Sequence, residues 1–148
     1  MRCVLQTVSY ASCKVDDKIT GQIEKGYMIL VGFKDGDNEE IIDKMVSKIK
    51  RLRIFEDENG KINLNIDAVN GSILSISQFT LYADTSKGNR PSFNTALAGD
   101  KSIILYKLFN DKLRENGLHV EEGIFGADMK ISLCNEGPKT IILDSDLM

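Results

Sequence analysis

The stretch Tyr27–Phe33, YMILVGF, is the feature that most limits how this chain can fold. A run with no charged residue and no polar face fits a strand that is covered on both sides, because a strand with one wet face would alternate apolar and polar residues. The run is far shorter than the roughly 18 apolar residues that suggest a membrane span. It therefore predicts a strand in a sheet core, and no membrane partner.

Other strands are indicated on both sides of this run. The N-terminal segment 3–15 alternates loosely and is rich in β-branched residues, which is typical of a strand. We expect KITG, ending at Gly21, to form the turn that leads into YMILVGF. Further strands are predicted at INLNI (62–66), GSILSISQFTL (71–81), HVEEG (119–123), MKISLCN (129–135) and KTIILD (139–144).

Two segments change to a helical period. Apolar residues recur at three- and four-residue steps from Ile41 to Leu52, with Asp37 or Asn38 as a possible N-cap. A second such pattern runs over 101–116 and stops at Gly117, a suitable C-cap. Strands outnumber helices, so the sequence predicts one α+β domain over residues 1–148, with a largely antiparallel, barrel-like sheet and two main helices.

Composition narrows the class of protein. The formal net charge of −3 does not favour a protein that holds long duplex DNA by charge, so no DNA partner is expected. Two basic runs, KIKRLR (48–53) and KGNR (87–90), are either solvated surface or local nucleic-acid contacts. Three cysteines without a C-x-x-C pair, and an N-terminus without a secretion signal, predict reduced thiols and a cytoplasmic location.

Common catalytic and cofactor motifs are missing from the sequence. The one histidine, His119, lies on a presumed strand edge and is better explained as a surface residue than as a catalyst. One histidine and scattered cysteines do not make a zinc site, and neither a phosphate-binding loop nor a G-x-G-x-x-G segment occurs. We therefore expect no metal and no cofactor.

Two short segments carry polar residues where a plain strand or turn would not need them. In SQFTL (77–81), Gln78 and Thr80 are either a polar pair that staples the core or part of a binding site. In NEGPKT (135–140), Gly137 and Pro138 have two interpretations. They form either an ordinary turn, or a fixed X-Pro peptide bond, which can be cis, that presents main-chain carbonyls to a ligand.

The same segments carry a family resemblance. MRCVLQTV, LRIFEDENGKINLNI, SQFTLYADTSKGNRPSF and GIFGADMKISLCNEGPKT, in this order along almost the whole chain, resemble the D-aminoacyl-tRNA deacylases, the D-tyrosyl-tRNA deacylase family. Both signature segments of that family, S-Q-F-T and N-x-G-P-x-T, stand intact. Lys139 is a departure, since many relatives have an apolar residue such as valine at this point.

The resemblance implies a homodimer with active sites at the interface. Ser77, Gln78, Phe79 and Thr80 would then line the pocket for the 3′-terminal aminoacylated adenosine of tRNA. The partner would supply Gly137 and Pro138, joined by a cis peptide. Substrate contacts are implied for a further set: Phe125, Met129 and Asn135.

The implied reaction is hydrolysis of the ester that joins a D-amino acid, or glycine mischarged on alanine tRNA, to the ribose, with L-aminoacyl-tRNA rejected by the Gly-Pro segment. Main-chain N–H groups near Phe79 and Thr80 could stabilise the oxyanion, and the ribose 2′-OH could help activate water. Thr80 as a covalent nucleophile is the competing mechanism. The competing function is a noncatalytic nucleic-acid-binding protein on the same fold.

Overall fold

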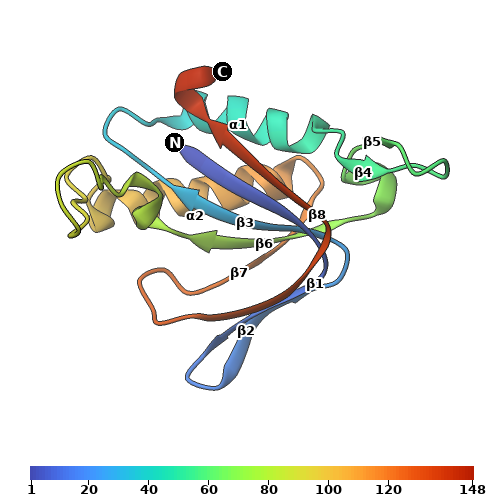
Figure 1. Ribbon diagram of the computed structural model, residues 1–148, viewed down its shortest axis with the longest axis horizontal. Helices are drawn as coiled ribbons and strands as arrows, with labels where there is room; N and C mark the ends of the chain where they lie inside the picture. The colour runs from blue at the N-terminus through green and yellow to red at the C-terminus, as the bar shows by residue number, and fades with distance from the viewer.

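The computed structural model describes residues 1–148, with a six-stranded curved sheet at its centre (Figure 1). β1 is long and pairs with three neighbours, all antiparallel, whereas β3–β6 and β6–β7 are parallel pairs. The strands of this sheet are β1 (Arg2–Val15), β2 (Lys18–Ile23), β3 (Gly26–Gly32), β6 (Ser72–Ser77), β7 (His119–Glu122) and β8 (Lys130–Asp144).

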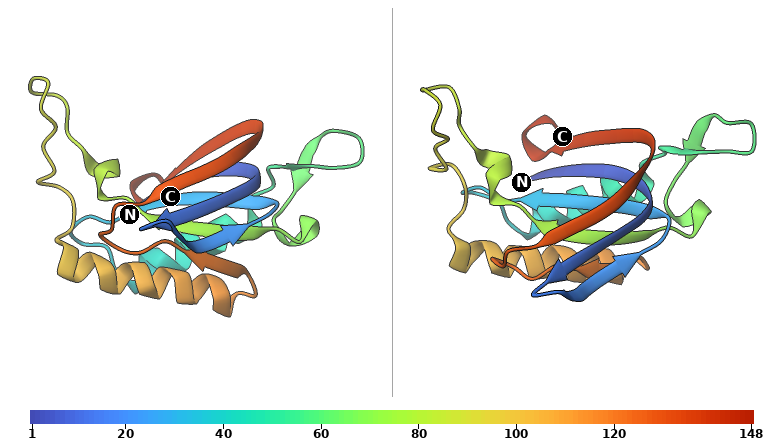
Figure 2. Two further views of the ribbon diagram at one scale, coloured as in Figure 1. Left: turned by 90° about the horizontal axis from the view of Figure 1, so that it is seen from below. Right: turned by 60° about the horizontal axis from the view of Figure 1, so that its bottom comes forward.

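Helices join the parallel strands, because a parallel connection needs a crossover. α1 (Glu39–Arg51) lies between β3 and β6 in the chain, and α2 (Gly99–Glu115) lies between β6 and β7. Figure 2 shows both helices together on one side of the sheet. The smaller elements are the hairpin of β4 (Phe55–Glu56) and β5 (Ile62–Leu64) and three 3₁₀ turns, η1 (Asp67–Val69), η2 (Phe79–Tyr82) and η3 (Ser145–Leu147).

The predicted two-sided burial of YMILVGF is confirmed. Tyr27, Ile29 and Val31 of β3 belong to the core cluster that also holds α1 and α2 side chains. Met28 points to the other face, where a second cluster includes Leu74. One strand thus separates two apolar cores, which explains why it carries no charge.

The predicted α+β, barrel-like class is also confirmed, and the two ends of the sheet come close together at Gly21. A Cβ atom at Gly21 would come within 2.7 Å of the Glu122 carbonyl oxygen, so β2 lies beside β7 and the sheet curls almost onto itself. The parallel centre of the sheet was not predicted. The expected turn at KITG is wrong, because the reversal occurs at Asp16 and Asp17 (φ 49° and 61°), short polar residues that tolerate this conformation.

Both predicted helices are confirmed to within two residues. Asn38 caps α1, since its side-chain oxygen accepts a hydrogen bond from the Ile41 N–H (3.1 Å). α2 begins at Gly99, two residues before the predicted start, and the chain turns away at Gly117 with φ +84°. Neither helix is long and apolar enough to cross a membrane.

β6 is shorter than the sequence indicated. The Gln78 N–H still donates to the Val31 carbonyl oxygen (2.7 Å), but the chain then leaves the sheet and winds into η2. The prediction of a strand through Leu81 is therefore wrong. The alternation of polar and apolar residues in SQFTL is typical of a strand, but the pairing with β3 ends at Gln78.

Candidate active site

A pocket of about 320 Å³ opens where β3 and β6 end. Parallel strands bring their carboxyl ends to the same edge of a sheet, which is where open α/β sheets commonly bind ligands. Two segments face each other across it, the end of β6 with the start of η2, and the chain between β7 and β8. The lining residues are Val31, Ile76, Ser77, Gln78, Phe79, Ser102, Phe125, Gly126, Ala127, Met129 and Ile131.

The turn from β6 into η2 shapes one wall of this pocket. The first intrahelical hydrogen bond of η2 runs from the Leu81 N–H to the Gln78 carbonyl oxygen (3.3 Å). The N–H groups of Phe79 and Thr80 precede that bond, and the first N–H groups of a helix have no acceptor within it. Two main-chain donors are therefore available beside the pocket.

Gln78 and Thr80 interact with each other rather than with the core. The Gln78 side-chain amide donates to the Thr80 hydroxyl, and Thr80 is exposed next to the pocket without lining it. Of the two interpretations left open by the sequence, a staple inside the core does not fit. The pair holds polar atoms at the rim of the pocket.

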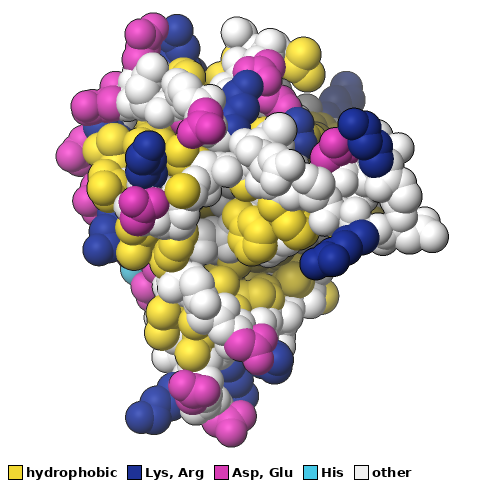
Figure 3. Space-filling view, turned by 90° about the vertical axis from the view of Figure 1, so that its left-hand side faces the viewer, with side chains coloured by type: hydrophobic (Ala, Val, Ile, Leu, Met, Phe, Trp, Pro, Cys, Tyr) yellow, Lys and Arg dark blue, Asp and Glu magenta, His cyan; other side chains and the backbone are white.

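Phe79 is unusually exposed for an aromatic residue beside a pocket, at 54% of its surface. Its ring lies against Phe93, with ring centroids 5.0 Å apart in an edge-on arrangement. Phe93 belongs to the long connection 83–98, which extends from one end of the molecule (Figure 2). Figure 3, which views that end, shows apolar side chains gathered around a hollow.

The opposite wall is braced by α2. Phe125 lies 5.9 Å from the Tyr106 ring, and the Tyr106 hydroxyl donates to the Ser75 carbonyl oxygen (2.8 Å). Burial raises the pKa of Tyr106, so this phenol stays protonated as a donor. The wall that carries Phe125 and Met129 is thus held to the back of β6.

None of the lining residues is titratable near neutral pH, because the set contains no Asp, Glu, His, Lys, Arg, Cys or Tyr. His119 lies apart from the pocket, with a 64% exposed side chain whose Nε2 is 3.5 Å from Glu121. No three His, Cys, Asp or Glu side chains come together in a way that could hold a metal ion. Chemistry in this pocket must rely on main-chain groups, hydroxyls, an amide and whatever the substrate brings.

The segment NEGPKT lies elsewhere in the same chain, as a bulge in the middle of β8. Opposite Gln6 to Val8 of β1, the pairing advances from Thr140 to Asn135, so residues 136–139 loop out of the ladder. Asn135, Gly137 and Pro138 are exposed, and none of them lines the pocket of their own chain.

Two expectations for this segment are wrong. It is not a turn between separate strands, because β1 pairs with β8 on both sides of the bulge. The Gly137–Pro138 bond is not cis, since the structure contains no cis peptide. Trans is the lower-energy isomer of an X-Pro bond by about 0.5–1 kcal/mol. Here Gly137, at φ +117°, supplies the change in chain direction.

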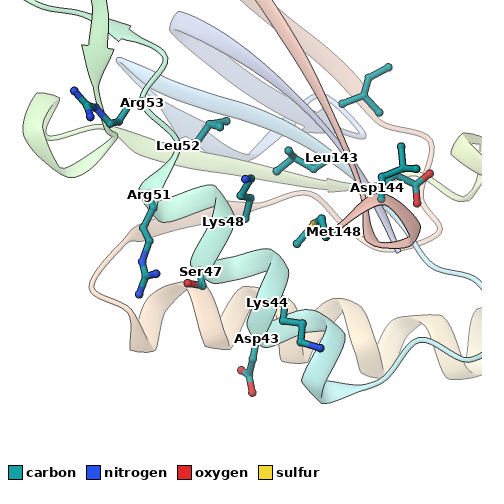
Figure 4. Close-up of a pocket in the computed structure, with 12 residues that line it drawn as sticks. Asp43, Lys44, Ser47, Lys48, Arg51, Leu52, Arg53, Leu143, Asp144 and Met148 are labelled. Carbon is teal, nitrogen blue, oxygen red and sulfur yellow. The ribbon is translucent and has the colours of Figure 1, made fainter.

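A larger cavity, of about 870 Å³, lies between α1 and the end of β8 (Figure 4). It includes part of the basic run KIKRLR, namely Lys48, Arg51 and Arg53. Lys48 points from α1 toward β8, whereas Arg51 and Asp43 point away from it. The cations do not converge on one point, so this cavity is a poorer candidate for chemistry than the pocket at η2.

Five of the lining residues are predicted by the sequence, namely Ser77, Gln78, Phe79, Phe125 and Met129, and the others are not. Ser102 could have been noticed, because it falls in the first turn of a predicted helix. Val31 and Ile131 gave no signal, since both look like ordinary strand residues. They become part of a site only because β3, β6, the β7–β8 connection and the start of β8 meet at this pocket.

Comparison with known proteins matches almost the whole chain. The family model described as D-Tyr-tRNA(Tyr) deacylase matches residues 4–144. A curated relative from Lactobacillus acidophilus, named D-aminoacyl-tRNA deacylase, is 54% identical over 144 residues, which cover 97% of this chain and 99% of the relative.

Two solved structures share the fold. One is named c-Myc DNA Unwinding Element Binding Protein, is 36% identical, has a TM-score of 0.91, and is aligned over 97% of this chain and 98% of its own. The other, titled as a probable eukaryotic D-amino acid tRNA deacylase, is 20% identical with a TM-score of 0.85 over 96% of this chain and 97% of its own, a likeness of fold alone.

Proposed function

Because the chain belongs to the D-Tyr-tRNA(Tyr) deacylase family, we propose that it hydrolyses the ester bond of D-aminoacyl-tRNA and releases the free D-amino acid and tRNA. The observation that carries this proposal is the pocket at η2, which has main-chain donors, Ser77 and Gln78, but no titratable side chain. An ester needs little acid catalysis to expel its alcohol, so such a site suits ester hydrolysis better than amide or phosphate chemistry. The predicted cytoplasmic location stays a prediction.

The chemical step uses groups of this chain for positioning and charge stabilisation. Water attacks the ester carbonyl carbon, the carbonyl oxygen gains negative charge, and the bond to the ribose oxygen then breaks, with the proton of water passing to that oxygen. The N–H groups of Phe79 and Thr80 stabilise the oxyanion. The neighbouring ribose 2′-OH assists the attacking water, because the lining offers no base.

Phe79 and the opposite wall hold the end of the tRNA. An exposed ring suits stacking against the terminal adenine, a contact worth about 1–3 kcal/mol per base. Phe125 and Met129 flank the aminoacyl group from the other side. Each of these roles is supported by the position of the residue at the pocket.

A second copy of the chain completes the site. The exposed bulge of one protomer, with Gly137 and Pro138 at its tip and Asn135 at its base, closes over the pocket of the other in a homodimer. Main chain placed beside the substrate Cα leaves no room for an L side chain but admits a D side chain or the hydrogen of glycine. Rejection of L-substrates then depends on exclusion, with little preference for a particular side chain, and glycine mischarged on alanine tRNA is accepted.

The substrate range tests this function. Purified protein is expected to deacylate D-tyrosyl-tRNA and glycyl-tRNA, and to act on L-tyrosyl-tRNA at least about 100-fold more slowly, a difference of about 2.7 kcal/mol in transition-state free energy. The measurement is release of labelled amino acid from each substrate, against its spontaneous hydrolysis. Equal rates for D- and L-tyrosyl-tRNA would contradict rejection by main chain.

The role of Thr80 separates two mechanisms. If Thr80 only accepts the hydrogen bond from Gln78, Thr80→Ala is expected to retain activity within about tenfold of the parent, whereas loss of a covalent nucleophile typically costs about 10⁴-fold or more. Single-turnover hydrolysis of D-tyrosyl-tRNA measures the effect. Trapping of an aminoacyl ester on Thr80 would establish the covalent mechanism instead.

The solved structure named for binding a DNA unwinding element gives a second candidate function, nucleic-acid binding without catalysis. The basic run at Lys48–Arg53 and the turn at Lys87–Arg90 are the surfaces that would serve it. The net charge of −3 opposes tight binding of a long duplex. Binding of tRNA or DNA with no release of D-amino acid would favour this function over the deacylase.

A further inference from the structure

The Gly137–Pro138 bulge is fixed at both ends, here called its first foot (Glu136) and its second foot (Lys139), by contacts with side chains of its own chain. At the first foot, the Thr7 hydroxyl of β1 donates to the Glu136 carbonyl oxygen at 2.5 Å. At the second foot, the Lys139 ammonium lies 3.3 Å from the Glu56 carboxylate of β4. The bulge therefore does not extend freely from β8.

The second foot is the unusual one, because a lysine occupies a mostly covered position. The Lys139 side chain is only 17% exposed, while Glu56 is 54% exposed. Both line a small cavity of about 100 Å³ together with Phe55, Thr7, Lys25 and Glu136. Lysine can bury its apolar stem while its charge reaches a partner at the rim, and this arrangement fits that behaviour.

Lys139 also contacts the tip of the bulge. A Cβ atom at Gly137 would lie 2.8 Å from the Lys139 Cγ, so the lysine stem packs directly under the glycine. Any movement of this stem changes the support of the Gly137 main chain. Glu56 is the one carboxylate within 4.0 Å of the Lys139 ammonium, so it is the charge that is available to hold the stem in place.

We propose that Lys139 and Glu56 are positioning residues that anchor the Gly-Pro bulge to the β4–β5 hairpin and so set the placement of its main chain. This inference rests on the proposed deacylase function for its effect on catalysis, but the anchor itself is a property of the chain alone. Neither residue touches the substrate. Their effect passes through Gly137 and Pro138 to the pocket of the partner protomer.

Four variants test the anchor. Lys139→Met keeps the stem and removes the charge, Glu56→Gln removes the charge of the partner, one double variant combines these two changes, and another exchanges the two charges. Partly exposed ion pairs contribute little, so each single change is expected to lower kcat/KM for D-tyrosyl-tRNA about two- to fivefold. The double variant should lose no more than either single one, because both remove the same interaction. The charge-swapped Lys139→Glu, Glu56→Lys double variant should regain part of the loss.

A second measurement needs no substrate. Amide hydrogen exchange at Asn135 and Thr140, where β8 pairs with β1 on either side of the bulge, is expected to speed up in Lys139→Met and Glu56→Gln alike. The control is Lys112→Met, which removes an equally covered lysine (18% exposed) from its pairs with Glu39 and Asp43 on α1 and should change neither the exchange at the bulge nor kcat/KM.

The outcomes separate the two levels of inference. If exchange at the bulge speeds up in both single variants while the parent fails to deacylate D-tyrosyl-tRNA, the anchor is supported and the proposed function is overturned. A parent that deacylates D-tyrosyl-tRNA, with exchange and kcat/KM unchanged in both single variants or with losses that simply add in the double variant, would overturn the anchor and leave the function standing.

Discussion

Replacing Gly137 with alanine is expected to slow hydrolysis of D-tyrosyl-tRNA by about 100-fold, equal to about 2.7 kcal/mol. Gly137 has φ +117°, a conformation that residues with a side chain rarely adopt. An alanine Cβ would also lie 2.8 Å from the Lys139 Cγ. The bulge must then change shape, and the main chain proposed to face the substrate moves with it.

Folding is separated from function by a matched variant. Gly60, in the turn of the β4–β5 hairpin, also has positive φ (+71°), but nothing lies within 4 Å of where its Cβ would be. Gly60→Ala should therefore carry the cost of a positive φ without the close contact, and keep a parent-like kcat/KM. If Gly137→Ala is as active as Gly60→Ala and both melt near the parent, the bulge has no part in catalysis.

The helices and the central strand were predictable because their signals are local. Asn38 indicates the start of α1 because its side chain can cap a helix. The unbroken apolar run of β3 indicates a strand that is covered on both faces. Each of these features depends on neighbours within a few residues. Such neighbours are visible in the sequence.

The site was harder to predict, because long-range pairing shapes it. β6, which contains Ser77, ends because its pairing with β3 stops at the bond from the Gln78 N–H to the Val31 carbonyl oxygen. No residue of SQFTL indicates this end. NEGPKT becomes a bulge because β1 pairs on both sides of it, and Thr7, more than a hundred residues away in sequence, holds its first foot. Glycine and proline indicated an irregular backbone but not its form.

Blocking the pocket is expected to be as damaging as changing the bulge. Ala127 lines the pocket, and the indole of Ala127→Trp would fill much of its roughly 320 Å³. Ala127 lies in the connection between β7 and β8, away from both core clusters, so the change should remove activity without unfolding the chain. A parent-like melting temperature with loss of D-tyrosyl-tRNA hydrolysis is the expected result.

The measurement that most directly tests a site shared by two protomers combines these variants in one dimer. Ala127→Trp and Gly137→Ala chains, co-expressed with different tags, should form mixed dimers in which one site has both a normal pocket and a normal bulge. Since half of randomly paired dimers are mixed and each has one intact site of two, activity should return to about a quarter of the parent's. Mixed dimers that stay as inactive as either variant alone would show that each site is built within a single chain.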